Sequence, residues 1–572
     1  MTAIIQDGRI WRCFAKPVKV ITAVTPAQVW PALLAVEAAV SRQRLYAAGF
    51  LAYEAAAAFG LAVHPPGDLP LLWFGLYEKE TRHSFNYPIT QLPHYPISNW
   101  QPAVNQSAYH AAIRQIKAAI ARGDTYQVNY TFPLRAEFAG EPLALFAGLA
   151  QAQQGSYAAY VDTGRFAICS ASPELFFRLD GEVLTSKPMK GTAVRGMTLA
   201  EDEANIAWLA QSEKNRAENV MIVDMIRNDM GRVAKIGSVQ VTELFAVERY
   251  PTVLQMVSTV QARTTRPLSE IFRAMFPCAS ITGAPKVRTM EIIRELEPQP
   301  RGAYTGAIGF VSPDGTAQFN VAIRTVTVDR ERGAAVYGVG SGIVWDSDAA
   351  AEYEECQVKA QVLAAKRPSF QLLESLLWQP GKGYFLLEEH LRRLADSAVY
   401  FDVPLDGAAA RQALARFALS LAEPCKIRLL VSPAGEMEIE AVPLAQGARP
   451  QPLRVALADT AVSSENVWLY HKTTRREWHD AARAAHPGCD EVILWNERGE
   501  LTEATTANVV LEMDGELLTP PVSCGLLAGT FRNHLLANGR IRERLLTKAD
   551  ARRARQIFLI NSVRRWQTAV LV

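Results

Sequence analysis

Lys190 and Glu174 are the first residues whose settings suggest chemistry. Lys190 lies in residues 186–192 (SKPMKGT), which read as a Pro- and Gly-bounded turn after a strand, a position from which an amine can point into a cleft. Glu174 follows a proline at the start of a predicted strand, where apolar neighbours would raise the pKa of the carboxyl enough for acid chemistry near neutrality. Taken singly, each residue has a plainer interpretation, as a solvated loop lysine and a strand-edge glutamate.

Two glutamates on predicted helices are further candidates. Glu218 lies early in an amphipathic helix that ends at the glycine of an RNDMG segment. On a second helix, predicted over residues 352–366, the side chains of Glu352, Glu355 and Lys359 share one face at the spacing i, i+3 and i+7. Such a face is most often a solvated ion pair, so these residues indicate a functional site only when other candidate residues accompany them.

Three segments have features of anion-binding sites. Residues 280–286 (SITGAPK) read as a tight turn in which proline opens a helix, whose free N–H groups and dipole suit a carboxylate. Arg324 interrupts an apolar strand predicted over residues 322–328, and its guanidinium needs an anionic partner, either a ligand or a structural salt bridge. The glycines of residues 338–347 lack the G-x-G-x-x-G spacing, so a dinucleotide site is rejected.

A second lysine in a comparable setting is Lys472. It lies in residues 470–476 (YHKTTRR), between a strand-like segment and a predicted helix for which Thr473 or Thr474 is the candidate N-cap. A basic loop is the plain interpretation. Three further segments accompany this lysine: residues 388–394 (EEHLRRL), 501–508 (LTEATTAN) and 527–532 (LAGTFR).

The elements that must position these residues fall into two mixed α/β domains. Strand-like runs alternate with helical stretches on both sides of a seam at residues 364–369, where proline disfavours helix in the residue before it. The expected domains are residues 1–366 and 369–572, and residues 1–105 join the first without a motif of their own. Predicted helices include 390–399 and 477–485, and predicted strands include 166–170, 334–339, 427–431, 491–495 and 508–512.

The composition excludes several classes of protein. The formal charge of +2 arises from 60 basic and 58 acidic residues without a basic stripe, so nucleic acid is not an expected partner. Residues 1–17 lack the apolar stretch of a signal peptide, and the apolar window 46–63 contains Glu54, which favours a buried strand and helix over a membrane span. The 7 cysteines are scattered without a C-x-x-C pair, as expected in a reduced, cytoplasmic protein.

The segments of the first domain, taken in order over about residues 109–366, resemble the chorismate-utilising enzymes, the family of anthranilate, isochorismate, salicylate and aminodeoxychorismate synthases. The resemblance implies a fold like that of anthranilate synthase component I, Mg²⁺ held by Glu218 and Glu355, and Glu174 as the general acid on the departing 4-hydroxyl. Chorismate is the implied substrate. The residues implied in binding it are Gln127, Thr192, Gly283, Tyr304, Arg324, Gly340, Gly342 and Lys359.

Two positions distinguish members of that family. Gln127 stands where isochorismate and salicylate makers carry a lysine that activates water, and an amide cannot be that base. Lys190 falls where aminodeoxychorismate synthases have lysine and anthranilate synthases have alanine; a neutral amine there can attack C2 while the 4-hydroxyl leaves.

Gln255 replaces a histidine of many relatives, so proton handling is expected to differ there. No G-x-C-x-G nucleophile is visible, so ammonia must come from a glutamine amidotransferase subunit or from solution.

The motifs of the second domain, over about residues 370–572, resemble the D-amino-acid and branched-chain aminotransferases, which are class IV pyridoxal phosphate (PLP) enzymes. The resemblance implies that Lys472 forms the Schiff base with PLP and that Glu503 pairs with the pyridinium nitrogen. It is compatible with a homodimer formed through this domain. The residues implied in holding the phosphate are Arg393, Thr506, Ala507, Gly529 and Thr530.

Together the two resemblances imply a bifunctional enzyme that makes 4-aminobenzoate for folate synthesis. The first domain would aminate chorismate to 4-amino-4-deoxychorismate, and the second would eliminate pyruvate from it, with Lys472 moving the proton. The second fold also permits transamination, and only its attachment to a synthase favours the lyase. Two alternatives remain: anthranilate synthase component I fused to an aminotransferase, against which Lys190 argues, and a degenerate binding scaffold, against which the full set of candidate residues argues.

Overall fold

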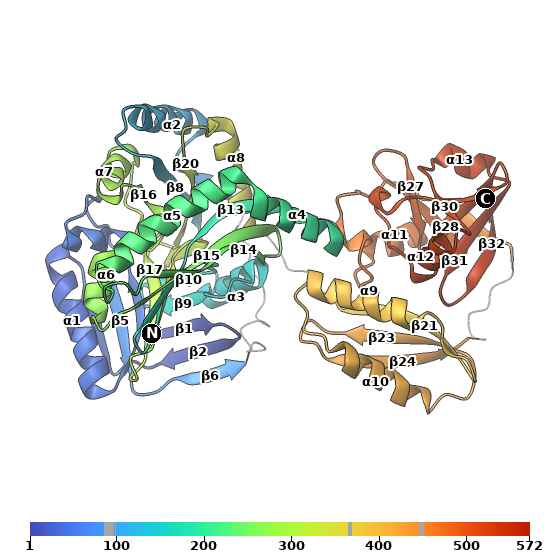
Figure 1. Cartoon of the computed structure of the whole chain (residues 1–572), viewed down its shortest axis with the longest axis horizontal. Coiled ribbons are helices and arrows are strands. Elements are labelled where there is room, and N and C mark those ends of the chain that lie inside the picture. Colours follow the sequence, from blue (N-terminus) through green and yellow to red (C-terminus); the bar gives the residue numbers. More distant parts are fainter. Residues whose placement is uncertain (85–96, 98, 364–368, 445–450) are drawn as a thin grey trace. The chain divides into compact units, whose positions relative to one another are not determined.

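A computed structural model describes residues 1–84, 97, 99–363, 369–444 and 451–572, which form two compact units (Figure 1). The first unit contains Met1–Val194 and Ile206–Arg367, and the second contains Arg195–Asn205 and Pro368–Val572. Most of the seam predicted at residues 364–369 lies outside the described residues. A short segment from the middle of the first half therefore belongs to the C-terminal unit, which the sequence did not predict.

The first unit is built on two large antiparallel sheets. The first sheet has the order β16 (Gly283–Ala284), β8 (Gln127–Glu137), β20 (Ala334–Ile343), β19 (Thr325–Asp329), β10 (Phe166–Ser170), β9 (Ala159–Asp162), β1 (Thr2–Asp7), β2 (Ile10–Ala15) and β6 (Thr81–Ser84), with β7 (Gln101–Pro102) beside β8. The second has the order β13 (Met189–Val194), β15 (Val253–Arg263), β12 (Val183–Lys187), β11 (Leu175–Asp180), β18 (Ala317–Val321), β17 (Ala307–Val311), β4 (Tyr46–Leu51), β5 (Leu72–Tyr77) and β3 (Lys19–Ala23), with β14 (Gln240–Arg249) beside β15.

The two sheets pack face to face, and helices cover their outer faces. Phe14 of the first sheet and Phe50 and Phe310 of the second belong to one buried cluster between the sheets. The outer face of the second sheet packs against α1 (Pro26–Gln43), α5 (Glu213–Gly231) and α6 (Leu268–Met275). The outer face of the first packs against α2 (Gln106–Ala121), α3 (Pro142–Gln153), α7 (Lys286–Leu296) and α8 (Ala349–Ala360).

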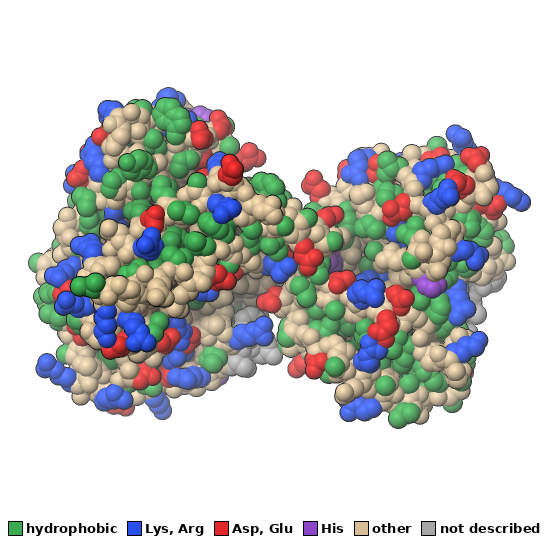
Figure 2. All heavy atoms as spheres, in the orientation of Figure 1, with side chains coloured by type: hydrophobic (Ala, Val, Ile, Leu, Met, Phe, Trp, Pro, Cys, Tyr) green, Lys and Arg blue, Asp and Glu red, His purple; other side chains and the backbone are tan. Residues whose placement is uncertain are grey.

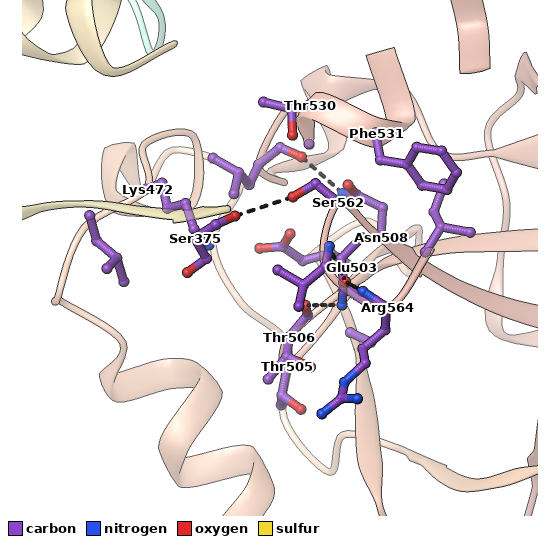
Figure 3. Close-up of a pocket in the computed structure, with 18 of the residues that line it drawn as sticks. Ser375, Lys472, Glu503, Thr505, Thr506, Asn508, Thr530, Phe531, Ser562 and Arg564 are labelled. Atoms are coloured by element: carbon purple, nitrogen blue, oxygen red, sulfur yellow. Dashed lines mark hydrogen bonds between the residues drawn. The ribbon is translucent and has the colours of Figure 1, made fainter. Parts of the chain in front are cut away.

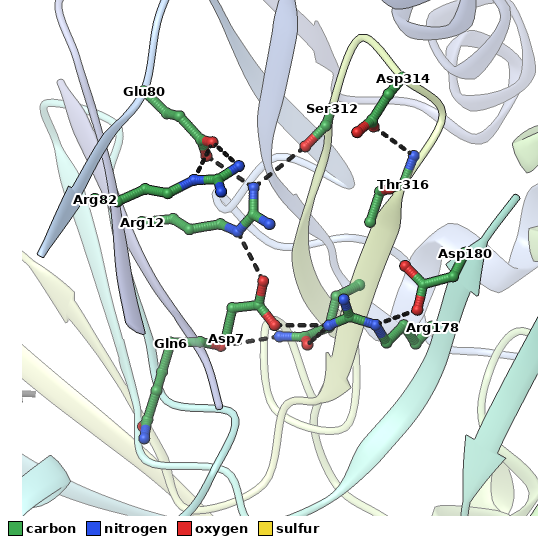
Figure 4. A network of polar contacts seen from close by, with 11 residues as sticks. Gln6, Asp7, Arg12, Glu80, Arg82, Arg178, Asp180, Ser312, Asp314 and Thr316 are labelled. Carbon is green, nitrogen blue, oxygen red and sulfur yellow. Dashed lines mark hydrogen bonds and ion pairs between the residues drawn. The ribbon is translucent and has the colours of Figure 1, made fainter. Parts of the chain in front are cut away.

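An ion-pair network ties the edges of the two sheets together (Figure 4). Asp7 of β1 accepts from Arg178 of β11 at 2.6 Å and from Arg12 of β2 at 2.8 Å, and Arg12 also pairs with Glu80 at 2.9 Å. Burial alone would raise the pKa of Asp7, but the hydrogen bonds and charges of Arg178 and Arg12 outweigh it, so the pKa is lowered. Asp7 thus stays ionised at neutral pH and holds both sheets.

Two local predictions in this unit were wrong. Lys190 does not lie in a turn: β12 and β13 pair with the same strand, β15, so the chain stays extended past Pro188. Arg324 does not lie within a strand, because β18 and β19 belong to different sheets and the chain bends between them, with Arg324 at a φ of 52°. In both cases a distant partner strand decides the conformation that the local sequence left open.

Other predictions for this unit were confirmed. Helix α5 begins at Glu213 and ends at Gly231, and the apolar window 46–63 forms β4 followed by a short 3-10 helix, Tyr53–Phe59. Helix α7 begins directly after Pro285.

No helix among the described residues is both long and apolar enough to cross a membrane. On the face shown in Figure 2, basic and acidic side chains are interspersed.

The second unit contains a small and a larger sheet. The small one has the order β22 (Gly383–Tyr384), β21 (Leu372–Gln379), β23 (Cys425–Val431) and β24 (Met437–Pro443), and α9 (Leu387–Tyr400) and α10 (Gly407–Ala418) pack on it. The larger one has the order β27 (Leu501–Ala504), β26 (Glu491–Trp495), β25 (Leu453–Leu457), β32 (Arg565–Leu571), β31 (Gln556–Asn561), β28 (Asn508–Met513), β29 (Glu516–Thr519) and β30 (Arg542–Glu543). The remaining helices are α11 (Glu477–Ala485), α12 (Thr530–Ala537) and α13 (Lys548–Arg553).

The predicted elements of this half agree closely with the structure. Helix α11 and strand β26 have the predicted bounds, and α9, β23 and β28 contain the predicted segments. The predicted N-cap was wrong: α11 begins after Arg476, and Thr473 instead forms a β-bridge with Leu372. Because that bridge holds Thr473 beside β21, the residue before it, Lys472, is fixed next to the small sheet.

The segment Arg195–Asn205 is an integral part of the C-terminal unit, and α4 (Leu199–Gln211) begins in it. Arg195 donates to Asp202, whose side chain is 0% exposed, and its guanidinium lies 4.2 Å from the ring centre of Tyr400 on α9. The carbonyl of Met197 lies 3.1 Å from Nε2 of His471. The segment therefore contacts the residue that immediately precedes Lys472.

Candidate active sites

The first candidate site forms where β13, β8 and β20 meet. A Cβ atom placed on Gly342 of β20 would lie 2.5 Å from Nε2 of Gln127 and 2.8 Å from Nζ of Lys190. The lysine amine and the glutamine amide therefore meet directly above this glycine, and a larger residue there would displace them. Asn219 of α5 fixes the strand by donating to the carbonyl of Lys190 at 3.2 Å. The predicted residues Lys190, Gln127 and Gly342 thus converge.

Charges around Lys190 come from the other predicted residues. Burial lowers the pKa of Lys190, and the positive charge of Lys359 adds to this effect, while Glu218, Glu174 and Glu355 oppose it. The net shift is downward, which increases the fraction of neutral amine at physiological pH. A neutral amine is the form that can act as a nucleophile.

Glu174, at the start of β11, has the properties expected of an acid. Its side chain is buried, with the residue 3% exposed. Burial raises its pKa to about 7, against the opposing effects of a hydrogen bond from Ser280, the charge of Lys190 and the N–H of Met189. Its Oε1 atom is buried without a hydrogen-bond partner among the described residues. An unpaired buried oxygen costs about 1–3 kcal/mol, which a polar ligand group would recover.

Glu218 and Glu355, the residues predicted to hold Mg²⁺, are close enough for the charge of Glu355 to act on Glu218. Burial raises the pKa of Glu218, and the negative charges of Glu352 and Glu355 contribute to the rise while Lys190 and Lys214 oppose it. Glu355 pairs with Lys359 at 2.5 Å. The convergence of carboxylates from α5 and α8 fits a hard divalent cation such as Mg²⁺. Among the described residues no group of three or more His, Cys, Asp or Glu side chains that could hold a metal ion occurs.

The predicted anion-binding residues lie around the end of α8. Arg324 donates to the carbonyl of Lys359, and Nζ of Lys359 donates to the carbonyl of Gly340 at 2.9 Å. The partner of Arg324 in this structure is thus a backbone oxygen, although its charge also lowers the pKa of Glu355. A guanidinium held this way remains available to a carboxylate. Arg324, Lys359 and Glu355 are therefore gathered at one place.

The remaining predicted residues serve the packing around that site. A Cβ on Gly283, whose φ is 145°, would lie 2.0 Å from the carbonyl oxygen of Gln127, and one on Gly340 would lie 2.4 Å from that of Tyr130. Tyr304 packs its ring against Gly338, where a Cβ would lie 2.1 Å from the ring. Thr192 is exposed and hydrogen-bonds at 3.1 Å to Gln255, which also donates to the carbonyl of Gly191 at 2.8 Å.

The second candidate site is a cavity of about 500 Å³ within the C-terminal unit (Figure 3), a size typical of small-molecule sites. It lies between the small and the larger sheet, since its walls include residues of β21 and β23 as well as β27 and β28. All of the residues predicted to bind PLP line it: Arg393, Lys472, Glu503, Thr506, Ala507, Gly529 and Thr530. The structure therefore brings the complete predicted set together.

Lys472 and Glu503 have the surroundings that their predicted roles require. Burial lowers the pKa of Lys472 to about 8, helped by the charges of Arg393 and Arg476. Glu503 is 7% exposed and its Oε1 lies 3.0 Å from Nε2 of His479 on α11. The amine is thus partly neutral near physiological pH, and the carboxylate is held in one orientation.

A buried polar chain that sequence reasoning missed fixes Arg393. Glu374 of β21 accepts from Arg393 at 2.9 and 2.7 Å and lies 2.6 Å from Nδ1 of His390, whose Nε2 lies 3.2 Å from Thr530. Burial would raise the pKa of Glu374, but Arg393 and His390 outweigh it and hold the pKa at about 2. A charged residue inside the apolar run LLESLLW was the available signal.

The start of α12 offers the cavity a candidate phosphate cradle. A Cβ on Gly529 would lie 2.0 Å from Oδ1 of Asn508, so a larger residue there would displace the Asn508 side chain. Gly529 precedes Thr530 at the first turn of α12, whose free N–H groups suit an anion. With the lysine, the buried carboxylate and Arg393 already in place, this chain's residues fit PLP.

Comparison with known proteins assigns the chain to a family. Residues 4–365 match the family model described as chorismate binding enzyme. The chain belongs to the chorismate-binding enzymes. The match includes residues 1–105 almost entirely, for which the sequence offered no motif. Residues 371–571 of this chorismate-binding enzyme match the amino-transferase class IV family model, so both predicted resemblances and the two predicted fold classes are confirmed.

Individual relatives agree with this assignment. The chain is 44% identical over 260 residues to aminodeoxychorismate synthase component 1 of Escherichia coli (strain K12), covering 45% of this chain and 57% of that protein. It is 40% identical over 269 residues to anthranilate synthase component 1 3 of Haloarcula marismortui, covering 46% and 53%. Anthranilate synthase component I from Streptococcus pneumoniae TIGR4 superposes with a TM-score of 0.55 at 25% identity, covering 62% and 92%. The match therefore spans little more than half of the curated relatives' length.

Proposed function

We propose that this chain converts chorismate to 4-aminobenzoate in two steps, one in each unit. The observation that carries the proposal is the position of Lys190, whose amine meets Gln127 above Gly342 amid the charges of Glu174, Glu218 and Glu355. The relative from Escherichia coli that is named an aminodeoxychorismate synthase component supports it. The product of such a synthase is the substrate that a lyase in the second unit would need.

In the first step, neutral Lys190 attacks C2 of chorismate while Glu174 gives its proton to the departing 4-hydroxyl, so that an N–C bond forms at C2 and water leaves from C4. Ammonia then adds at C4, and the bond between C2 and Lys190 breaks. Arg324 and Lys359 orient the substrate carboxylates. Mg²⁺ held by Glu218 and Glu355 would supply positive charge for a carboxylate. The lowered pKa of Lys190 and the raised pKa of Glu174 both shift these groups towards the protonation state that the step needs.

In the second step, pyruvate leaves 4-amino-4-deoxychorismate and the ring becomes aromatic. PLP supplies an electron sink when bound. Lys472 removes the proton from C4 of the ring and returns a proton to the departing enolpyruvate, which becomes pyruvate as the C3–O bond breaks. Glu503, oriented by His479, holds the pyridine ring, and Arg393 with the turn at Gly529 holds the phosphate. The lowered pKa of Lys472, about 8, allows both proton transfers near neutral pH.

Further parts of the proposal concern the setting of these reactions. We assign the synthase to residues 1–366 and the lyase to residues 369–572, the latter together with Arg195–Asn205, which belongs to the second unit. The name component 1 carried by the relative from Escherichia coli supports a separate glutamine amidotransferase subunit as the ammonia source. We place the reactions in the cytoplasm and the product in folate synthesis, and we expect a homodimer formed through the second domain.

The proposal is tested by incubating the purified chain with chorismate, Mg²⁺, ammonium and PLP and identifying the aromatic product by chromatography and mass. We expect 4-aminobenzoate and pyruvate in equal amounts. Anthranilate as the product would show that the interpretation of Lys190 is wrong. Accumulation of 4-amino-4-deoxychorismate without pyruvate would refute only the lyase step.

The pH dependence of amination tests Glu174. Because the acid form donates the proton and its pKa is about 7, the ratio of the wild-type rate to the Glu174→Gln rate should fall as the pH rises through 7, at a constant concentration of free ammonia; the titration of Lys190 affects both chains and cancels in this ratio. Below pH 7, Glu174→Gln should lower the rate by about 100-fold or more. Glu248→Gln, which changes a more exposed carboxylate of β14, is the control. A ratio of the two rates that is the same at pH 6 and pH 8 would contradict the role.

A further inference from the structure

The cavity of the C-terminal unit contains more positive charge than the cofactor phosphate requires. Besides Lys472 and Arg393, four basic residues line it: Lys426 and Arg428 on β23, Arg476 before α11, and Arg564 after β31. Arg393 is already paired with Glu374. The four other residues therefore form a separate group, called here the basic cluster.

Lys426 is the centre of the basic cluster. Burial lowers its pKa, and the other charges acting on it, from Arg428, Arg476 and Arg564, are all positive. Among the described residues, no hydrogen bond or ion pair engages its amine. A half-buried cation surrounded only by cations is destabilising unless an anion joins it.

The other members are held in place by the protein itself. Arg428 pairs with Glu440 at 2.8 Å, Arg476 donates to the carbonyl of Thr505, and Arg564 donates to the carbonyl of Leu444 at 2.9 Å. Backbone carbonyls orient a guanidinium without cancelling its charge. Among the described residues neither Lys426 nor Arg476 is paired with a carboxylate, so the cluster carries positive charge that the protein does not neutralise.

The basic cluster borders the reacting amine. Arg476 lowers the pKa of both Lys472 and Lys426, so it lies within electrostatic reach of each. Ser562, two residues before Arg564, donates to the carbonyl of Ser375 at 3.2 Å, which joins the turn after β31 to β21 (Figure 3). A ligand reacting at Lys472 would therefore have its anionic groups within range of the cluster.

We propose that the basic cluster binds the two carboxylates of a cyclic dianion and makes the second unit selective for dicarboxylates over ordinary amino acids. This inference rests on the proposed function, since 4-amino-4-deoxychorismate carries one carboxylate at C1 and another on the enolpyruvyl group at C3. A monocarboxylate would leave most of the cluster's charge unmatched. Lys426 is thus a specificity-determining residue, and its position on β23 separates its role from that of the phosphate cradle at Gly529.

Isophthalate, with carboxylates at positions 1 and 3 of a ring, and benzoate are suitable probes. Each is titrated into the PLP-loaded full chain while the visible absorption of bound PLP is followed, because binding in the first unit does not affect that band. Isophthalate should bind about tenfold more tightly than benzoate. Lys426→Ala should weaken the binding of isophthalate about tenfold and the binding of benzoate less than about twofold. Lys426→Arg should restore most of the lost affinity for isophthalate.

Lys382→Ala is the matched control, because Lys382 lies in the exposed turn between β21 and β22 and does not line the cavity. The inference is overturned if isophthalate does not bind, if it binds no more tightly than benzoate, or if Lys426→Ala weakens both ligands equally. A chain that prefers isophthalate but releases no pyruvate from 4-amino-4-deoxychorismate would retain the dicarboxylate site and lose the proposed lyase function. The two failures are therefore distinguishable.

Discussion

Lys190→Ala should abolish the formation of 4-amino-4-deoxychorismate, with a fall in rate of about 1000-fold or more. The amine lies directly above Gly342 next to the Gln127 amide, and no other described lysine approaches that glycine as closely. Without a nucleophile that attacks C2, the covalent step in which the 4-hydroxyl leaves as water cannot occur. The measurement is the rate of amination by the full chain with ammonium as the nitrogen source, and the product should be checked for a shift towards anthranilate.

Lys187→Ala provides the control for this experiment. Lys187 lies on β12, three positions earlier, and its partly exposed amine is 3.8 Å from the partly exposed carboxylate of Glu248. Exposed ion pairs contribute about 0–1 kcal/mol, so this variant should fold and aminate normally. Unchanged amination kinetics in Lys190→Ala would exclude the covalent mechanism, whereas equal losses in both variants would indicate damage to the strand.

Lys472→Ala should stop the second step and leave the first intact. 4-Amino-4-deoxychorismate should accumulate, 4-aminobenzoate formation should fall about 1000-fold or more, and the visible absorption of lysine-bound PLP should disappear. Because the amine captures PLP in its neutral form and its pKa is lowered to about 8, capture of added PLP by the wild-type chain should accelerate as the pH rises through 8.

Absorption spectra and product analysis on the same preparation check this prediction. Lys382→Ala, outside the cavity, should keep both the absorption band and the product. A band that persists in Lys472→Ala would place the cofactor on another amine. Full production of 4-aminobenzoate without the band would remove PLP chemistry from the proposal, while amination by Lys190 would be unaffected.

The residues that the family resemblances implied are brought together in the structure more reliably than local conformation was predicted. Gly342 and Gly529 came from those resemblances, and both lie where another group approaches the backbone closely, which restricts the residue type. The conformations at Lys190 and Arg324 were predicted wrongly, since β15 and the change of sheet after β18 are distant in sequence and leave no local pattern. Tertiary pairing overrode local propensity in both places.

Residues that support others were the ones that sequence reasoning missed. Glu374 acts through Arg393 and His390, and His479 acts through Glu503, so neither belongs to a compact motif. Their pairing partners are separated by 16 or more positions in the chain. A single sequence contains no record of such pairs, apart from a polar residue at a buried position.

The segment Arg195–Asn205 limits how this chain can be divided or recombined. A gene cut at residue 368 would encode a C-terminal fragment that lacks the buried Arg195–Asp202 pair stacked on Tyr400 and the carbonyl next to His471. Because Arg195–Asn205 belongs to the C-terminal unit, exchanging residues 368–572 alone between chains would move that unit without one of its own segments.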